Sequence, residues 1–64
     1  MKLYLLDPSK DNDFKEVSLE ELEAARVEME RINFKYRHSY GFNEMILFEV
    51  KDGNMYFKIE EYEC

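Results

Sequence analysis

The chain has 64 residues, and its fifteen acidic and nine basic side chains give a formal net charge of −6. This charge disfavours nucleic-acid binding, because lysine and arginine contacts to phosphates supply most of that affinity. The single cysteine, Cys64, excludes an internal disulfide, and no apolar run is long enough to span a membrane. We therefore expect one compact domain over residues 1–64, in the reducing environment of the cytoplasm.

The first predicted element is a short apolar strand over residues 2–6. Asp7-Pro8 ends it, because proline cannot donate a ladder hydrogen bond and disfavours helix in the residue before it. Residues 7–15 are rich in turn formers and predict a polar loop, with Phe14 as its anchor to the core. The spacing of the acids in this loop does not fit the EF-hand template, so we predict no metal site.

A helix is predicted to follow Ser18, which forms a capping box with Glu21 three residues later. Its buried stripe recurs at three- and four-residue steps and consists of Leu22, Ala25, Met29 and Ile32. The other faces are charged and include the i,i+3 pairs Glu23–Arg26 and Glu28–Arg31. The pattern therefore predicts a helix with one buried side and a solvated remainder.

Residues 33–40 alternate ring-bearing and polar side chains, which predicts a strand with its rings on one side. The ring-bearing residues are Phe34, Tyr36, His38 and Tyr40. We interpret His38, the single histidine, as a structural residue, because a general base or metal site needs further groups nearby. Gly41 is the expected break before the next strand.

Two alternating runs on either side of Asp52-Gly53 predict a hairpin over residues 44–62 with a type I′ turn. Counting outward from the turn pairs Val50 with Met55, Phe48 with Phe57, and Ile46 with Ile59. This register gathers six apolar side chains on one face: Ile46, Phe48, Val50, Met55, Phe57 and Ile59. Residues 63–64 are expected to fray.

The predicted element order is β-α-β-β-β. It describes an α+β fold in which a single helix packs on one face of a small, mainly antiparallel sheet. The helix is expected to cover the six apolar side chains of the hairpin, with Leu3, Leu5, Phe34 and Tyr36 completing the core. The position of the first strand stays open, although a crossover connection would make it parallel to one of the later strands.

One helix covers only one side of such a sheet, so the other side is expected to be open. The residues predicted to bind a partner there are Met45, Leu47, Tyr56, Tyr62 and Arg37. Methionine, tyrosine and arginine are enriched at protein–protein contacts. We therefore predict that another protein, or a second copy in a homodimer, binds this face. The alternative is an ordinary solvated face with scattered apolar residues.

The sequence favours a non-enzymatic protein-binding module. It shows no nucleophile–base pair, metal cluster or phosphate-binding loop, and we expect no cofactor. The short length, acidic charge and aromatic content are typical of small bacteriophage inhibitors or regulators of host proteins, and no motif identifies a family. The acids Glu20, Glu23 and Glu30 are expected to steer the approach to a basic partner surface.

Two alternative functions involve nucleic acids. The carboxylates could imitate phosphates, which would make the protein a nucleic-acid mimic that blocks a DNA- or RNA-binding protein. The basic patch over residues 31–38 could instead bind single strands weakly, with Tyr36 and Tyr40 as stacking platforms, although the net charge opposes it. Salt separates these cases, because a mimic should lose affinity steeply with salt and an aromatic contact should not.

Overall fold

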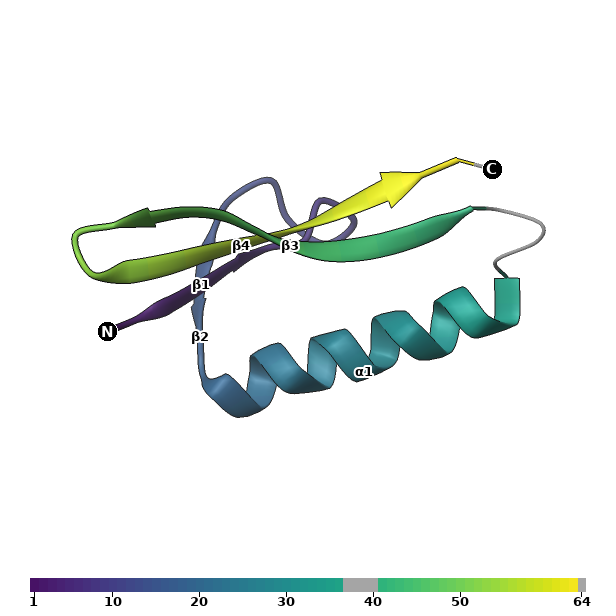
Figure 1. Cartoon of the computed structure of the whole chain (residues 1–64), viewed down its shortest axis with the longest axis horizontal. Coiled ribbons are helices and arrows are strands. Elements are labelled where there is room, and N and C mark those ends of the chain that lie inside the picture. Colours follow the sequence, from purple (N-terminus) through teal and green to yellow (C-terminus); the bar gives the residue numbers. More distant parts are fainter. Residues whose placement is uncertain (37–40, 64) are drawn as a thin grey trace.

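The computed structural model describes residues 1–36 and 41–63. In chain order its elements are β1 (Leu3–Leu6), β2 (Lys15–Val17), α1 (Leu19–Tyr36), β3 (Phe42–Lys51) and β4 (Asn54–Tyr62). The strands form one four-stranded sheet in the order β2-β1-β4-β3, and α1 lies along one side of it (Figure 1). This confirms the predicted α+β class with a single helix packed on one face of the sheet.

The sheet is mixed, and β1 lies inside it. β1 pairs antiparallel with β2 and parallel with β4, with Leu5 opposite both Lys15 and Phe57. The first strand is thus parallel to a later one, as expected for a crossover connection. β2 was not predicted, because its three residues include two charged side chains and are too few to show an alternating pattern.

The start of α1 confirms the predicted capping box. The backbone N–H of Ser18 donates to Glu21 Oε1 at 3.0 Å, and the N–H of Glu21 donates to Ser18 Oγ at 3.1 Å. Leu22 and Met29 are the two buried apolar side chains of the described residues, and both belong to the predicted stripe. The pattern of apolar residues and the cap therefore identified the helix start and its buried side.

The end of α1 differs from the prediction. The helix continues to Tyr36, so the strand predicted over residues 33–40 is wrong for residues 33–36, and the rest of that prediction lies outside the described residues. Phe34 is 77% exposed and does not join the core. Adding residues to a helix that is already nucleated is cheap, so a weak alternating pattern at its end did not stop it.

The hairpin turn is confirmed by positive φ angles at Asp52 (53°) and Gly53 (77°). Beyond it, Val50 pairs with Met55 as predicted, but a register shift between Leu47 and Glu49 leaves Phe48 as an extra residue. Such a β-bulge places two residues of one strand opposite a single residue of the other.

On the N-terminal side of the bulge, the side chains of β3 point to the opposite faces from those predicted. Leu47 pairs with Phe57 and Ile46 with Lys58, so the predicted pairs Phe48–Phe57 and Ile46–Ile59 are wrong. By strand alternation, Ile46 and Phe48 therefore leave the helix-facing side, while Leu47 joins it.

Asn33 ties the end of α1 to the edge of β3. Its Nδ2 donates to the carbonyl oxygen of Asn43 at 2.7 Å, and the N–H of Asn43 donates to Asn33 Oδ1 at 2.8 Å. β3 is an edge strand, so these bonds satisfy backbone groups that no neighbouring strand reaches. Leu47 pairs with Phe57, whose neighbour Tyr56 contacts the loop on the other face, so Leu47, and Met45 by alternation, lie on the α1 side.

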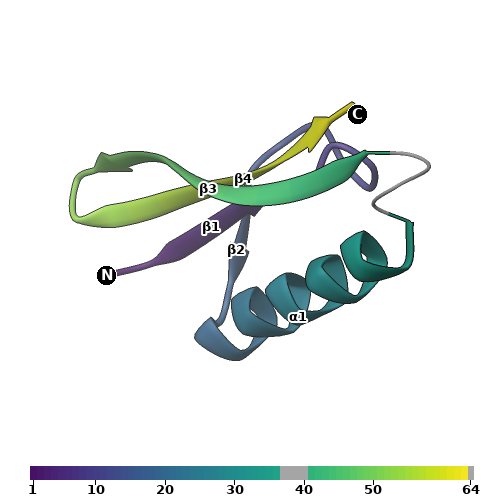
Figure 2. The ribbon, with the colours of Figure 1, turned by 45° about the vertical axis from the view of Figure 1, so that its right-hand side comes forward.

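The opposite face of the sheet is partly covered by the loop between β1 and β2, which rises on the side away from α1 (Figure 2). Phe14 in this loop packs edge-on against Tyr56 at 5.3 Å and against Phe48 at 5.6 Å between ring centroids. Tyr4 stacks on Tyr56 at 4.7 Å. Phe14 therefore anchors the loop, as predicted, but on the face that was expected to be open.

Gly41 provides a test of how tightly the ends of β3 and β4 approach each other. It is buried at φ +95°, and a Cβ there would overlap the carbonyl oxygen of Tyr62, whereas a Cβ at Gly53 (φ +77°) meets nothing within 4 Å. We expect Gly41→Ala to lower the free energy of unfolding by about 3 kcal/mol, against about 1 kcal/mol for Gly53→Ala. Urea unfolding measures both values, and equal losses would contradict the close approach.

Candidate functional site

The partner-binding residues predicted on β3 and β4 do not form one surface. Met45 and Leu47 lie on the α1 side of the sheet, whereas Tyr56 and Tyr62 lie on the other side. Leu47 is 50% exposed and Met45 is half-buried. Arg37 lies outside the described residues. The bulge in β3 is the reason that the two pairs are separated.

The two tyrosines also have close neighbours within the chain. Tyr56 is half-buried between the rings of Tyr4 and Phe14. Tyr62 stacks on Phe42 at 5.0 Å, and its hydroxyl donates to the Glu60 carboxylate at 3.1 Å. This hydrogen bond raises the pKa of Tyr62 above its ordinary value. The face therefore carries an aromatic cluster that is partly enclosed, rather than a bare sheet.

The predicted acids of the helix do lie together, and they share their side of α1 with two apolar residues. We call this set the acidic stripe, and it consists of Glu20, Glu23, Val27, Glu30 and Phe34. Steps of three and four residues place its members along one side of the helix. All five are exposed, and this side is turned away from the buried residues Leu22 and Met29.

The charges of the acidic stripe are mostly uncompensated. Glu23 lies 3.5 Å from Arg26, with both side chains about half exposed. Among residues 1–36 and 41–63, no ion pair involves Glu20 or Glu30. The stripe therefore presents negative charge to any approaching molecule.

An ion pair lies beside the acidic stripe on the same helix. Arg31 and Glu28 approach to 2.6 Å between Nη2 and Oε1, and Arg31 Nε also donates to Oε2 at 3.2 Å. The hydrogen bond from Arg31 lowers the pKa of Glu28. The two-pronged contact fixes both side chains beside the stripe.

Val27 and Phe34 were not recognised as functional candidates from the sequence. Val27 is 62% exposed, and Phe34 had been assigned to a strand. The signal was present in their spacing, because residues seven apart lie on the same side of a helix. It becomes visible only when the helix is extended to Tyr36.

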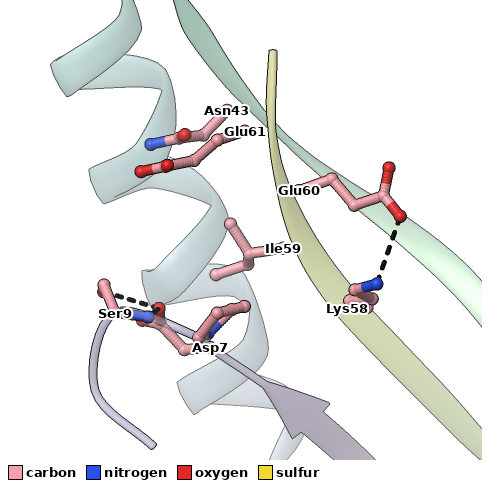
Figure 3. Close-up of a pocket in the computed structure, with 8 residues that line it drawn as sticks. Asp7, Ser9, Asn43, Lys58, Ile59, Glu60 and Glu61 are labelled. Carbon is pink, nitrogen blue, oxygen red and sulfur yellow. Dashed lines mark hydrogen bonds and ion pairs between the residues drawn. The ribbon is translucent and has the colours of Figure 1, made fainter. Parts of the chain in front are cut away.

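A hollow of about 360 Å³ lies where β4 continues past the end of β1. Figure 3 shows Asp7 and Ser9 on one side of it and the Lys58–Glu60 pair on the other, with Ile59 directed toward α1. Asp7 Oδ1 accepts hydrogen bonds from the Ser9 hydroxyl at 2.7 Å and from its N–H at 3.1 Å, and Lys58 Nζ lies 3.4 Å from Glu60. Asp7, Lys58 and Glu60 thus already have partners within the chain.

Within the described ranges, no group of three or more histidine, cysteine, aspartate or glutamate side chains is arranged to hold a metal ion. The basic patch predicted over residues 31–38 is only partly described, and its described part, Arg31 to Tyr36, belongs to α1. His38, Tyr40 and Cys64 lie outside the described residues.

Comparisons of the chain with protein-family models, curated proteins and solved structures give no match. None of the described helices has the length and apolar character needed to cross a membrane. The function proposed below therefore depends on the geometry and charges of the chain itself.

The hydrogen bond at Tyr62 gives a prediction in alkaline solution. Because it raises the pKa of Tyr62, its contribution to stability is complete below the ordinary tyrosine pKa and is lost as pH rises through the higher folded-state value. We expect Glu60→Gln to lower the pKa of Tyr62, measured by ultraviolet titration with Tyr62→Phe as the reference. Glu61→Gln is the matched control, and an equal shift in both variants would contradict this assignment.

Proposed function

We propose that the protein is a non-enzymatic binding module whose acidic stripe docks into an apolar groove, rimmed by basic side chains, on another protein. The observation that carries this proposal is the exposure of Val27 (62%) and Phe34 (77%) beside carboxylates, on the side of α1 away from the core. A helix that needs only solubility carries polar residues on that side. Large apolar residues exposed on one helix side are the anchors of helix-in-groove recognition.

The spacing of the two apolar residues suits such a contact. They are seven residues apart, which is about 10.5 Å along the helix axis. Their burial would supply most of the binding free energy, because a few buried anchors dominate protein contacts. Glu20 and Glu30 would accelerate association with a basic surface and fix the orientation of the helix.

The helix is already formed and attached to the sheet before it binds. The capping box at Ser18 fixes its start, the Glu28–Arg31 pair spans its middle, and Asn33 ties its final turn to β3. A surface that is already ordered loses less conformational entropy on binding than a flexible one. A small protein of this kind acts by occupying a surface that its partner needs. It inhibits or regulates the partner without any catalytic group, in the manner of bacteriophage effectors.

The nucleic-acid mimic is the weaker alternative for the same residues. A mimic needs carboxylates that follow the path of the phosphates and are surrounded by polar groups. In the acidic stripe, Val27 and Phe34 lie between and beyond the carboxylates and add apolar surface that a phosphate-binding groove does not match. Apolar anchoring therefore explains the stripe more completely than charge imitation does.

The test is quantitative capture of partners from the source cells, with mass spectrometry and the double variant Val27→Ser/Phe34→Ser. We expect the variant to bind the captured partner about 30-fold more weakly than the wild type, which corresponds to about 2 kcal/mol. Val50→Ser is the matched control, because Val50 is equally exposed (62%) but lies on the hairpin. Circular dichroism verifies that each variant is folded.

Charge reversal then separates the two functions. For apolar docking, Glu20→Lys/Glu30→Lys slows association about 10-fold, and the affinity of the wild type falls only modestly with salt. A mimic shows a steep linear decrease of log affinity with log salt. Unchanged capture by Val27→Ser/Phe34→Ser would rule out the proposed docking surface.

A further inference from the structure

The outer edge of β3 is protected at its ends and open between them. β3 has no strand neighbour on this side among the described residues. The backbone groups of Asn43 are occupied by Asn33, and the bulge at Phe48 interrupts the regular strand at the other end. We call the stretch between them, residues 44–48, the open window.

The open window is unusually apolar for a strand edge. Its residues are Glu44, Met45, Ile46, Leu47 and Phe48, with a single charge among them. Leu47 and Phe48 are 50% and 52% exposed. Proteins generally protect free edges with charges, prolines or bulges, because an unguarded edge pairs with another strand. Here the protection stops at the two ends of the window.

We infer that the open window of a second copy occupies this edge, in an antiparallel pairing about a two-fold axis at Ile46. The N–H and C=O groups of Asn43 point outward to Asn33, so those of Met45 and Leu47, two and four residues further, also point outward. Antiparallel pairing places Met45 of each copy opposite Leu47 of the other. The two pairs together form four backbone hydrogen bonds.

The open windows of two copies match each other when they run in opposite directions. Two of its residues precede Ile46 and two follow it, so the two-fold axis superimposes one window on the other. The end of each window next to Asn43, where Asn33 is bound, then lies beside the bulged end of the partner's window. Both ends prevent the strands from sliding to another register.

The charges beside the window are also complementary. Glu44 and Ile46 pair with Glu60 and Lys58 of β4, so these side chains share the face away from α1. Lys58 Nζ lies 5.9 Å from the centre of the Phe48 ring on this face. The proposed register places Phe48 opposite Glu44 of the partner, and thus brings Lys58 of each copy close to the Glu44 carboxylate of the other.

This dimer does not depend on the proposed function, because it uses a strand edge rather than the acidic stripe. It also differs from pairing through an open sheet face, which the loop at Phe14 partly covers. A contact of five residues per strand lies at the low end of specific interface sizes, below about 1,200 Å². We therefore expect dissociation constants in the micromolar range.

Disulfide trapping tests the register. In a background of Cys64→Ser, Ile46→Cys places two thiols across the two-fold axis as a non-hydrogen-bonded pair, with Cα atoms about 4.5 Å apart and within disulfide reach. We expect oxidised dimer to form at least 10-fold faster than for Val50→Cys, an exposed position of the same strand beyond the bulge. Equal rates at the two positions would overturn the register.

Sedimentation equilibrium tests the dimer itself, at about 150 mM salt to screen the net charge of each copy. Glu44→Lys and Lys58→Glu should each weaken dimerisation at least 5-fold, and the double variant Glu44→Lys/Lys58→Glu should restore it to within about 2-fold of the wild type. Because Glu44→Lys also places a cation opposite Glu60 within the same chain, the decisive measurement mixes the two single variants. Heterodimers of Glu44→Lys with Lys58→Glu should form about as well as wild-type dimers, since opposite charges then meet only across the interface, and failure of the mixture to pair overturns the contact.

The two proposals fail separately. A wild-type protein that remains monomeric at millimolar concentration overturns the dimer, whatever the acidic stripe binds. A second outcome also overturns the dimer. If a substitution of Leu47 abolishes binding of a captured partner while the wild type shows no self-association, a strand of another protein occupies the open window. Val27→Ser/Phe34→Ser should leave the dimer unchanged, and a lost dimer in that variant contradicts pairing by the strand edge alone.

Discussion

The bulge at Phe48 determines which side chains of the hairpin meet the helix. Strand alternation allows only two assignments of β3, and one extra residue exchanges them for every position before the bulge. Leu47 consequently faces α1, while Ile46 and Phe48 lie on the side of Phe14. The same residue ends the regular edge of β3, so the arrangement of the core and the length of the open window have a common origin.

The two faces of the sheet are covered by different means, and neither cover is complete. α1 lies on one face with Leu22 and Met29 buried, and the loop at Phe14 covers part of the other face. A chain of 64 residues has too little apolar material to enclose both faces fully. Specific polar contacts such as the two hydrogen bonds between Asn33 and Asn43 therefore position the elements, and apolar side chains such as Val27 and Leu47 remain exposed.

Features encoded in a few adjacent residues could be predicted from the sequence, and features set by distant packing could not. The capping box at Ser18 and the turn at Asp52-Gly53 depend on local geometry, and both are present. The ring of Phe48 at the bulge packs with Phe14, a residue distant in the sequence, and no local pattern reveals this contact. For the candidate site, the shared side of the helical acids followed from helical periodicity, whereas Phe34 became a member only once the helix was extended past the apparent strand.

The two proposed surfaces would act together if both are used. Pairing of β3 edges about a two-fold axis perpendicular to the sheet continues one sheet through both copies, so both helices lie on the same face of it. The two acidic stripes would then point in a common direction. A partner that carries two grooves, itself a dimer for example, would bind the second stripe at a high effective concentration after the first. Weak self-association would in that case convert a modest contact through Val27 and Phe34 into a strong and selective one.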